Sequence, residues 1–270
     1  MAAELFELWR RLNNAPYHFP MDEQTWQNSM YSDTDSDGRP LFAELHTEAV
    51  ENGLIQYGRT AFGFDDAGEI SECIHYPVIR ILCFEDPLVG KTLLDCAMNR
   101  FNTTERVYAY FHYFGMSACG RHGKLHQKDA HVEKLLLENG FSVEHENVYY
   151  SRTLTDADAG GSSILLNWKP LSAGSCCEFA AVANGQEIGW GQVHFLPQGD
   201  IAYLRWIYID GSRQHQGYGT AVMRALFADL YARGIRRFDT DTAPNNIAAQ
   251  HYYEKTGFTN EGITRSYYTK

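Results

Sequence analysis

The sequence lacks any unbroken apolar run of the roughly 18 residues that a membrane-spanning helix needs. Residues 1–11 do not read as a secretory leader, because they mix acidic with apolar residues, whereas a leader needs a basic start and a continuous apolar stretch. These two absences predict a soluble, cytoplasmic protein with no membrane partner.

Cysteine is scarce and irregularly spaced. The six cysteines form no Cys-x-x-Cys pair, and a disulfide framework is expected mainly in much shorter secreted chains. We therefore expect reduced, mostly buried thiols. The His- and Cys-containing run at residues 111–126 also lacks metal-site spacing, so no metal centre is predicted.

Basic residues are outnumbered. The 23 Lys and Arg stand against 34 Asp and Glu, which gives a formal net charge of −11. Affinity for nucleic acid comes largely from basic residues that neutralise phosphates, so this balance argues against nucleic acid as a partner. It would suit a cationic substrate.

An internal repeat is present. The segment 131–141, HVEKLLLENGF, echoes the segment 248–258, AAQHYYEKTGF, and each reads as a helix closed by glycine and followed by a strand. A helix starting near Gly90 in the first half likewise corresponds to one starting near Gly219 in the second. Because 270 residues suffice for two ordinary domains, we predict a duplicated chain.

The small, polar stretch 155–163 reads as an exposed linker. We place the domain boundary there, which gives domains at residues 1–154 and 155–270. Apolar residues at helical spacing predict two helices near the start of the first domain, over 4–12 and 41–50. The second domain is mostly strand-like before its glycine-rich segment and lacks opening helices, so we expect the first domain to build part of its substrate wall.

A glycine-rich loop follows the apolar strand 204–209 and runs directly into a helix. Gly217 and Gly219 permit close approach of a ligand to the backbone, and the first free N–H groups of a helix attract an anion. Taken alone, Gly-x-Gly before a helix is equally compatible with a plain tight turn.

The sequence after this helix narrows the choice of ligand. Asn246 is placed to cap a second helix, which ends at Gly257. Asn246 and Tyr253 are seven residues apart, so they share one face of that helix at a separation of roughly 10 Å along the axis. One ligand could therefore touch both side chains.

Seven residues, in order, fit the signature Gln/Arg-x-x-Gly-x-Gly/Ala followed by Asn-x6-Tyr-x3-Gly-Phe: Gln214, Gly217, Gly219, Asn246, Tyr253, Gly257 and Phe258. Residues 204–270 thereby resemble the GNAT superfamily of acyl-CoA-dependent acetyltransferases. The resemblance implies an α/β fold of two tandem GNAT-like units, each an α+β mixed sheet flanked by helices.

The resemblance also implies roles for particular residues. The backbone of Ile207, Tyr208 and Ile209 would bind the pantetheine arm and acetyl carbonyl of acetyl-CoA, and Asn246 would contact the same arm. Tyr253 would protonate the departing thiolate, with core packing as the alternative. After the leading Gln214, the pyrophosphate would be held by His215, Gln216, Gly217, Tyr218, Gly219 and Thr220.

The attacking amine must lose a proton, which calls for a carboxylate near the thioester. Asp241 is the candidate base, because it lies where some protein N-terminal acetylating members of the superfamily carry a catalytic glutamate. Asp239 points to the same strand face by period two and is the second candidate. A solvated or capping aspartate is the open alternative for Asp241.

The first half departs from the signature. Its loop, residues 86–91, keeps Gly90 but has Leu88 at the place of the other glycine and lacks the leading Gln or Arg, while Leu136 lies near the tyrosine position. Residues 1–154 are therefore interpreted as a degenerate GNAT-like domain with a structural or substrate-shaping role, beside a catalytic domain at 155–270.

The implied activity is an N-acetyltransferase that moves the acetyl group of acetyl-CoA to a primary amine by direct transfer in a ternary complex. The acceptor would be a small-molecule or peptide amine, and fold analogy does not identify it. The alternative is a non-catalytic acyl-CoA sensor or pseudoenzyme. The sequence leaves monomer and homodimer open.

Residues 33–44 also match the ligand spacing of a calcium-binding EF-hand loop, with oxygen-bearing residues at positions one, three, five and twelve. Pro40 at position eight and the lack of a clear incoming helix favour a solvated loop ahead of the 41–50 helix.

Overall fold

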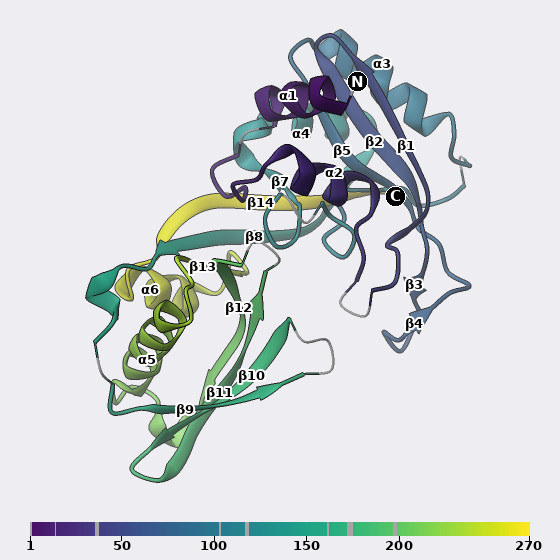
Figure 1. Ribbon diagram of the computed structural model, residues 1–270. Coiled ribbons are helices and arrows are strands. Elements are labelled where there is room, and N and C mark those ends of the chain that lie inside the picture. The colour runs from purple at the N-terminus through teal and green to yellow at the C-terminus, as the bar shows by residue number, and fades with distance from the viewer. Residues whose placement is uncertain are drawn as a thin grey trace. The chain divides into compact units, whose positions relative to one another are not determined.

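The computed structural model describes residues 2–13, 15–35, 38–102, 104–116, 119–160, 162–171, 175–196 and 199–270. It divides into two compact units: unit 1 comprises residues 1–146 and 263–270, and unit 2 comprises residues 147–262 (Figure 1). No helix in the described ranges is long and apolar enough to cross a membrane.

Unit 1 contains four α-helices in the part of the chain that the structure describes. They are α1 (Ala2–Leu12), α2 (Glu23–Tyr31), α3 (Pro87–Met98) and α4 (Ala130–Glu138). Its strands are β1 (Phe42–Val50), β2 (Gly53–Thr60), β3 (Gly63–Phe64), β4 (Ile70–Ser71), β5 (Pro77–Phe84), β6 (Tyr108–Ala109), β7 (Leu125–His126) and the first part of β8 (Phe141–Thr153).

The sheet of unit 1 has helices on both faces (Figure 1). Its strand order is β1-β2-β5-β6-β14, where β14 spans Thr259–Thr269, and only β5 and β6 run parallel among these neighbours. Side chains of α3 and α4 form one core with Ile55, Ile79 and Leu82. Those of α1 and α2 form another with Leu54 and Ile81, because successive strand residues point to opposite faces.

Of the two helices expected near the start of unit 1, the one over 4–12 is confirmed as α1, and the one over 41–50 needs correction. Residues 42–50 are a strand, not a helix: β1 pairs antiparallel with β2 from Phe42↔Thr60 to Val50↔Gly53. Pairing with a buried neighbour overrides the helical spacing of a few apolar residues. The second helix is instead α2, which begins after Asp22, whose carboxylate accepts the Thr25 N–H at 2.8 Å.

The calcium-type loop therefore has a different setting from the one expected. An incoming helix, α2, does precede it, but a strand follows. The Asp33 carboxylate pairs with the buried Arg80 guanidinium, and Asp35 pairs with Arg39 at 2.8 Å. Residues 36 and 37 of the loop lie outside the described residues.

In the described part of unit 2, two α-helices, α5 (Tyr218–Ala232) and α6 (Ile247–Lys255), follow the first five strands. The strands are the last part of β8, β9 (Leu165–Pro170), β10 (Cys176–Ala183), β11 (Gln186–Phe195), β12 (Ile201–Ile209), β13 (Arg237–Thr242) and the start of β14 (Thr259–Thr269). Their order is β8-β13-β12-β11-β10-β9, with β12 and β13 parallel and the other pairs antiparallel.

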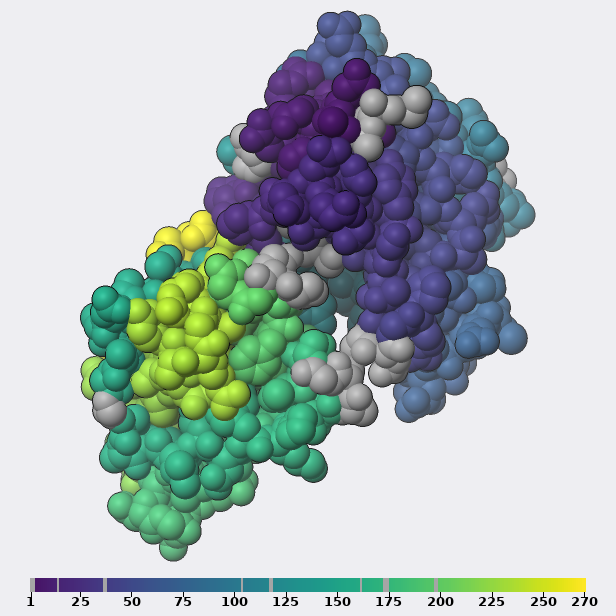
Figure 2. Space-filling view, in the orientation of Figure 1, coloured from purple at the N-terminus to yellow at the C-terminus, as the bar shows by residue number. Residues whose placement is uncertain are grey.

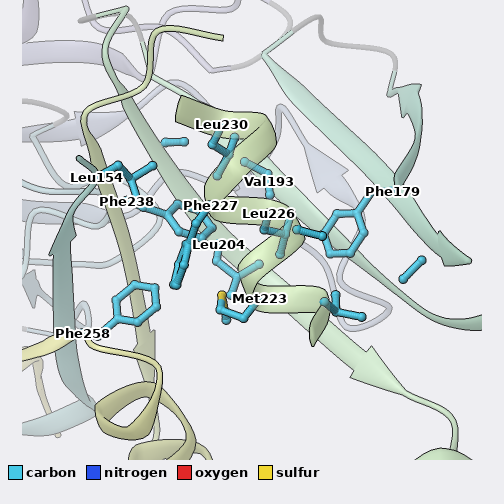
Figure 3. Close-up of a cluster of buried hydrophobic side chains, with 14 of the residues drawn as sticks. Leu154, Phe179, Val193, Leu204, Met223, Leu226, Phe227, Leu230, Phe238 and Phe258 are labelled. Carbon is cyan, nitrogen blue, oxygen red and sulfur yellow. The ribbon is translucent and has the colours of Figure 1, made fainter. Parts of the chain in front are cut away.

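The core of unit 2 lies between this sheet and α5. Met223, Leu226 and Leu230 of α5 pack against Leu204 and Phe238 of the strands (Figure 3). This is the helix that the sequence predicts directly after the glycine-rich loop. The outer face of α6 forms part of the molecular surface, where its yellow-green atoms are visible in Figure 2.

The predicted repeat is confirmed at the level of elements. α4 ends before Gly140, with φ +85°, and leads into β8, while α6 ends before Gly257, with φ +88°, and leads into β14. In both places glycine adopts the left-handed backbone that terminates a helix without strain from a Cβ atom.

The division between the units differs from the boundary expected at residue 154. Strand β8 passes from unit 1 to unit 2 after Glu146, and β14 passes back after Gly262. The stretch expected to be a linker belongs to unit 2: Asp158 accepts from Arg152 at 2.6 Å. Leu154 beside it is buried in the unit 2 core.

All six cysteines are free thiols, and three of them, Cys83, Cys119 and Cys176, are buried. Burial raises the pKa of the Cys119 thiol to about 12, which keeps it protonated and unreactive at neutral pH.

Candidate active site

Unit 2 contains a pocket of about 840 Å³, within the size range of small-molecule sites. It is bounded by strands β8, β12 and β13, the start of α5, and α6. The lining residues are Asn147, Arg205, Trp206, Ile207, Ile209, Gln214, His215, Gly219, Asp241, Thr242, Ala243, Asn246, Ala248, Ala249, Tyr252 and Tyr253.

The pocket exists because two parallel strands part. β12 and β13 are paired from Ile201↔Arg237 to Leu204↔Thr240 and no farther in the described chain. The Thr240 hydroxyl donates to the Leu204 carbonyl at 3.0 Å and closes the paired stretch. Beyond it, residues 207–209 of β12 keep their pairing with β11 but turn their other edge to the gap. That edge offers backbone N–H and C=O groups to a ligand.

A β-bulge in β12 coincides with the parting. Its register with β11 shifts so that Leu204 and Trp206 oppose neighbouring residues and Arg205 is the extra one. Leu204 and Ile207 consequently both pack against the core beneath α5, although residues three apart in an unbroken strand point to opposite faces. The bulge thus swings residues 205–209 away from β13.

Two glycines of β11 hold the bulged strand close. Gly189 and Gly191 lie opposite Ile209 and Ile207. A Cβ on Gly189 would come within 2.2 Å of the Tyr208 carbonyl oxygen, and one on Gly191 within 2.5 Å of the Trp206 carbonyl oxygen. Any larger residue at these positions would push β12 out of its path.

The glycine-rich loop ends in an uncapped helix N-terminus. Gly217 is the N-cap of α5, with φ +84°, and no side chain caps it. The first helical hydrogen bond runs from the Ala221 N–H to the Gly217 carbonyl at 3.1 Å. The N–H groups before Ala221 thus lie outside the helical ladder, and with the helix dipole they form a binding place for an anion.

Two glutamines brace this loop from within. The Gln214 side chain donates to the Ile209 carbonyl at 2.8 Å, and the Gln216 side chain donates to the Ser212 carbonyl at 2.8 Å. His215 between them has a positive φ of +59°, an uncommon conformation for a residue with a Cβ. The side chains of the glutamines thus fix the shape of the loop and leave its backbone for the ligand.

Helix α6 brings Asn246 and Tyr253 to the same pocket. Asn246 caps the helix as expected, its side-chain oxygen accepting the Ala249 N–H at 3.2 Å. Tyr253 is 7% exposed and packs beside Tyr150 and Phe258. It therefore combines the core role and the pocket position that the sequence left as alternatives.

The environment of Tyr253 keeps its phenol protonated. Burial is the main reason that the pKa of Tyr253 is raised above 10, and the negative charge of Asp241 acts in the same direction, while a hydrogen bond with Thr240 opposes them. A neutral phenol in a pocket is a proton donor at neutral pH.

The two candidate bases, Asp241 and Asp239, lie in different environments. Asp241 lines the pocket, and the Asn147 amide of β8 donates to its carboxylate at 3.1 Å. Asp239 is fully buried and accepts from Tyr149 at 2.7 Å and from Arg237 at 2.9 Å. Asp239 is not among the residues that line the pocket.

The model of the acetyltransferase (GNAT) family matches residues 141–258, which include every residue of this pocket. Residues 141–258 are a GNAT domain.

The GNAT domain has relatives among characterised enzymes. An aminoglycoside N(6')-acetyltransferase type 1 of Klebsiella pneumoniae is 29% identical over 104 residues, which cover 34% of this chain and 52% of the relative. A [ribosomal protein bS18]-alanine N-acetyltransferase of Escherichia coli K12 is 36% identical over 69 residues, 26% of this chain and 47% of the relative. The chain thus spans about half the length of the curated relatives it matches.

Solved structures extend the likeness to the whole fold. A tandem GNAT protein from the clavulanic acid biosynthesis pathway matches with a TM-score of 0.56 and 12% identity, over 99% of this chain and 94% of that one. A GNAT-family acetyltransferase from Colwellia psychrerythraea matches with a TM-score of 0.51 and 14% identity, over 99% and 96%. The predicted α/β fold of tandem GNAT-like units is confirmed.

In the GNAT domain, the backbone N–H groups at the start of α5 form an anion-binding cradle. The corresponding loop of unit 1, before α3, offers no such place to an anion. Asp86 caps α3, its carboxylate accepting the Leu88 N–H at 2.8 Å, and Pro87 at the first turn has no N–H to offer. The Phe84 ring covers Gly90, where a Cβ would lie 2.5 Å from it. A fixed negative charge thus stands where the GNAT domain leaves free N–H groups.

The structure brings most of the expected site residues together and leaves others outside the lining. Those in the lining are Ile207, Ile209, Gln214, His215, Gly219, Asp241, Asn246 and Tyr253. Those outside it are Tyr208, Gln216, Gly217, Tyr218 and Thr220. For the residues outside the lining, we expect contacts with the ligand through backbone groups only.

Several residues that line the pocket were not predicted from the sequence. Asn147 comes from the strand that follows the first repeat copy, so nothing in its own copy points to this pocket. Tyr252 donates its hydroxyl to the Gly219 carbonyl at 2.7 Å and ties α6 to the start of α5. The adjacent tyrosines at 252 and 253 were the available signal for that contact.

Proposed function

We propose that the GNAT domain transfers the acetyl group of acetyl-CoA directly to a primary amine in a ternary complex. The observation that carries the proposal is that one pocket contains the free edge of β12, the uncapped start of α5, and both Asp241 and Tyr253. A strand edge, an anion cradle, a carboxylate and a protonated phenol are the groups that this transfer needs.

The residues present fit acetyl-CoA. The backbone of residues 207–209 would hold the pantetheine arm as an added strand holds its neighbour. The N–H groups of residues 215–220 would hold the pyrophosphate, and the amide nitrogen of Asn246 remains available to the arm after its oxygen caps α6. When bound, acetyl-CoA supplies an activated acetyl thioester.

The side chains supply proton transfer. The amine nitrogen attacks the acetyl carbonyl carbon, the new C–N bond forms and the C–S bond breaks. Asp241 accepts the proton that the amine loses, directly or through a water molecule, and Tyr253 donates its phenolic proton to the departing sulfur. The phenolate then recovers a proton from solvent and Asp241 releases its proton to solvent, so atoms and charge balance over one turnover.

We further propose that unit 1 has a structural or substrate-shaping role and binds no CoA of its own. Its support is that the Asp86 carboxylate caps α3 and takes up the Leu88 N–H, a group of the kind that a phosphate would need. Calorimetric titration of the whole chain with CoA should then show one site, and two sites would contradict this assignment.

The proposal is tested by an acceptor screen. Purified protein with acetyl-CoA is offered small amines, aminoglycosides and peptides with free N-termini, while free thiol and the mass of the acetylated product are followed. The relatives named above acetylate an aminoglycoside and a ribosomal protein alanine, which makes both classes suitable first members. Tight CoA binding without turnover on any acceptor would support the alternative, a non-catalytic acyl-CoA sensor.

A further inference from the structure

The proposed reaction leaves one charged residue of the pocket without a task. Arg205 lines the pocket and is exposed. Two other arginines of unit 2 are engaged: Arg152 with Asp158 at 2.6 Å and Arg237 with Asp239 at 2.9 Å. Among the described residues, no hydrogen bond, ion pair or ring contact engages the Arg205 guanidinium.

The bulge decides where this guanidinium points. Leu204 and Ile207 both pack toward α5, so the two residues between them, Arg205 and Trp206, project from the opposite face of the sheet. Asp241 projects from that same face. Thr240, the residue before it on β13, hydrogen-bonds with Leu204 and Tyr253, so the next side chain points to the opposite face. There the Asp241 carboxylate accepts a hydrogen bond from Asn147 of β8.

Arg205 and Asp241 are neighbours across the gap. The last paired residues of the parting strands are Leu204 and Thr240, so the next residue on each strand is Arg205 on one side and Asp241 on the other. A positive and a negative side chain therefore flank the place where β12 leaves β13, on the face turned away from the helices.

The pyrophosphate of CoA is not the partner of Arg205. From Arg205 to the end of β12 at Ile209 the strand extends roughly 13 Å, and the phosphate cradle begins only after that end. The cradle also lies at the start of α5, on the other face of the sheet. An anion at Arg205 must belong to the other substrate.

We infer that the amine acceptor carries an oxyanion close to its amine, and that Arg205 binds this oxyanion while Asp241 receives the amine. This inference rests on the proposed function. Guanidinium groups recognise carboxylates and phosphates through paired N–H donors, so an amino acid or a phosphorylated amine has the required chemistry. A polycationic acceptor would place a positive group against Arg205 and is disfavoured.

Matched acceptor pairs test the inference. Thiol release from acetyl-CoA is measured for the common amino acids against their carboxamides, and for phosphoethanolamine against ethanolamine. The two arms distinguish a carboxylate from a phosphate. The amine of a carboxamide loses its proton more readily than that of the free acid, so intrinsic reactivity alone favours the neutral partner. We expect the anionic member of at least one pair to show a kcat/KM at least tenfold higher.

Arg205→Gln should reduce the ratio of kcat/KM between the anionic and the neutral acceptor at least tenfold and leave CoA affinity unchanged. Arg205→Lys should restore part of that ratio. Arg224→Gln is the matched control, because Arg224 is exposed on α5 and does not line the pocket. The inference would be overturned if neutral acceptors were used as well as anionic ones. It would also be overturned if Arg205→Gln weakened CoA binding but left the anionic-to-neutral ratio of kcat/KM unchanged.

Calorimetry separates this inference from the proposed function. If the CoA-loaded protein binds an anionic amine through Arg205 but releases no thiol with acetyl-CoA, the inference stands and the transfer reaction fails. If thiol is released without preference for the anion, the reaction stands and the inference fails. If none of the anionic amines binds or reacts, the inference is wrong.

Discussion

At the residue scale, the proton donor and acceptor of the proposed reaction differ in how deeply they are held. Tyr253 is 7% exposed and packed among aromatic rings, whereas Asp241 is half-buried on a strand. A packed ring tolerates loss of its hydroxyl without collapse, so the phenol can be tested by removing one oxygen.

Tyr253→Phe should lower kcat by about 10² or more while changing acetyl-CoA affinity little, because the ring stays and the proton donor is lost. Steady-state rates and CoA calorimetry measure the two effects. Since the pKa of Tyr253 is raised above its usual value, loss of this proton should not lower the wild-type rate near neutral pH. Equal kcat in the variant would remove Tyr253 from the mechanism.

Asp241→Asn should also lower kcat by about 10² or more, because an amide cannot accept the proton of the amine. The lost rate should return in part at alkaline pH, where more of the amine is already deprotonated. A pH profile of kcat/KM for variant and wild type is the measurement. Parallel profiles at all pH values would show that Asp241 is not the base.

At the scale of elements, the start of α5 decides CoA affinity through its backbone. Gly217→Ala places a Cβ on a residue with φ +84°, which costs roughly 1–2 kcal/mol in backbone strain. Relief of that strain would rotate the N–H groups of the cradle, so the dissociation constant of CoA should rise at least tenfold in calorimetry.

Gly234→Ala is the matched control. Gly234 follows the other end of the same helix with φ +91°, and at both glycines a Cβ would meet nothing within 4 Å. The two variants should lose similar thermal stability, but only Gly217→Ala should lose CoA affinity. Equal loss of affinity in both would assign the effect to general strain in α5.

At the scale of the whole molecule, unit 1 depends on the last strand of the chain. Tyr267 of β14 is 1% exposed, lies in the unit 1 core and pairs with Ala109 of β6. Tyr267→Ala should destabilise unit 1 by about 3 kcal/mol. Hydrogen exchange should then speed up in α4 and β6 while α5 keeps its protection, and Tyr267→Phe should keep most of the protection in unit 1. Uniform loss across both units would contradict this.

Acid should also act on unit 1. Burial, aided by Lys124 and His112, lowers the pKa of His145 to about 4 in the folded protein, below the usual value of about 6.5 in an unfolded chain. Between these values only the unfolded chain binds the proton, so the free energy of unfolding falls as pH drops from 6.5 toward 4. His145→Gln should flatten this decline in melting temperature. The control is His251→Gln, a change of an exposed residue on α6, and identical slopes for all three proteins would refute the prediction.

The sequence by itself determined the glycine-rich loop, the cap at Asn246, the repeat and the family, because these depend on neighbours close in the chain. The helix that follows the glycine-rich loop, α5, was predicted for the same reason. Helical spacing misplaced the second helix, since a short apolar spacing in 41–50 does not reveal that β2 offers an unpaired edge.

Only the tertiary structure decided the rest. The bulge at Arg205, the parting of β12 from β13 and the arrival of Asn147 through β8 all depend on pairing between segments far apart in the chain. Asp239 and Asp241 look alike in sequence. They differ because Tyr149 and Arg237 occupy one carboxylate, while the gap between the strands exposes the other to the pocket.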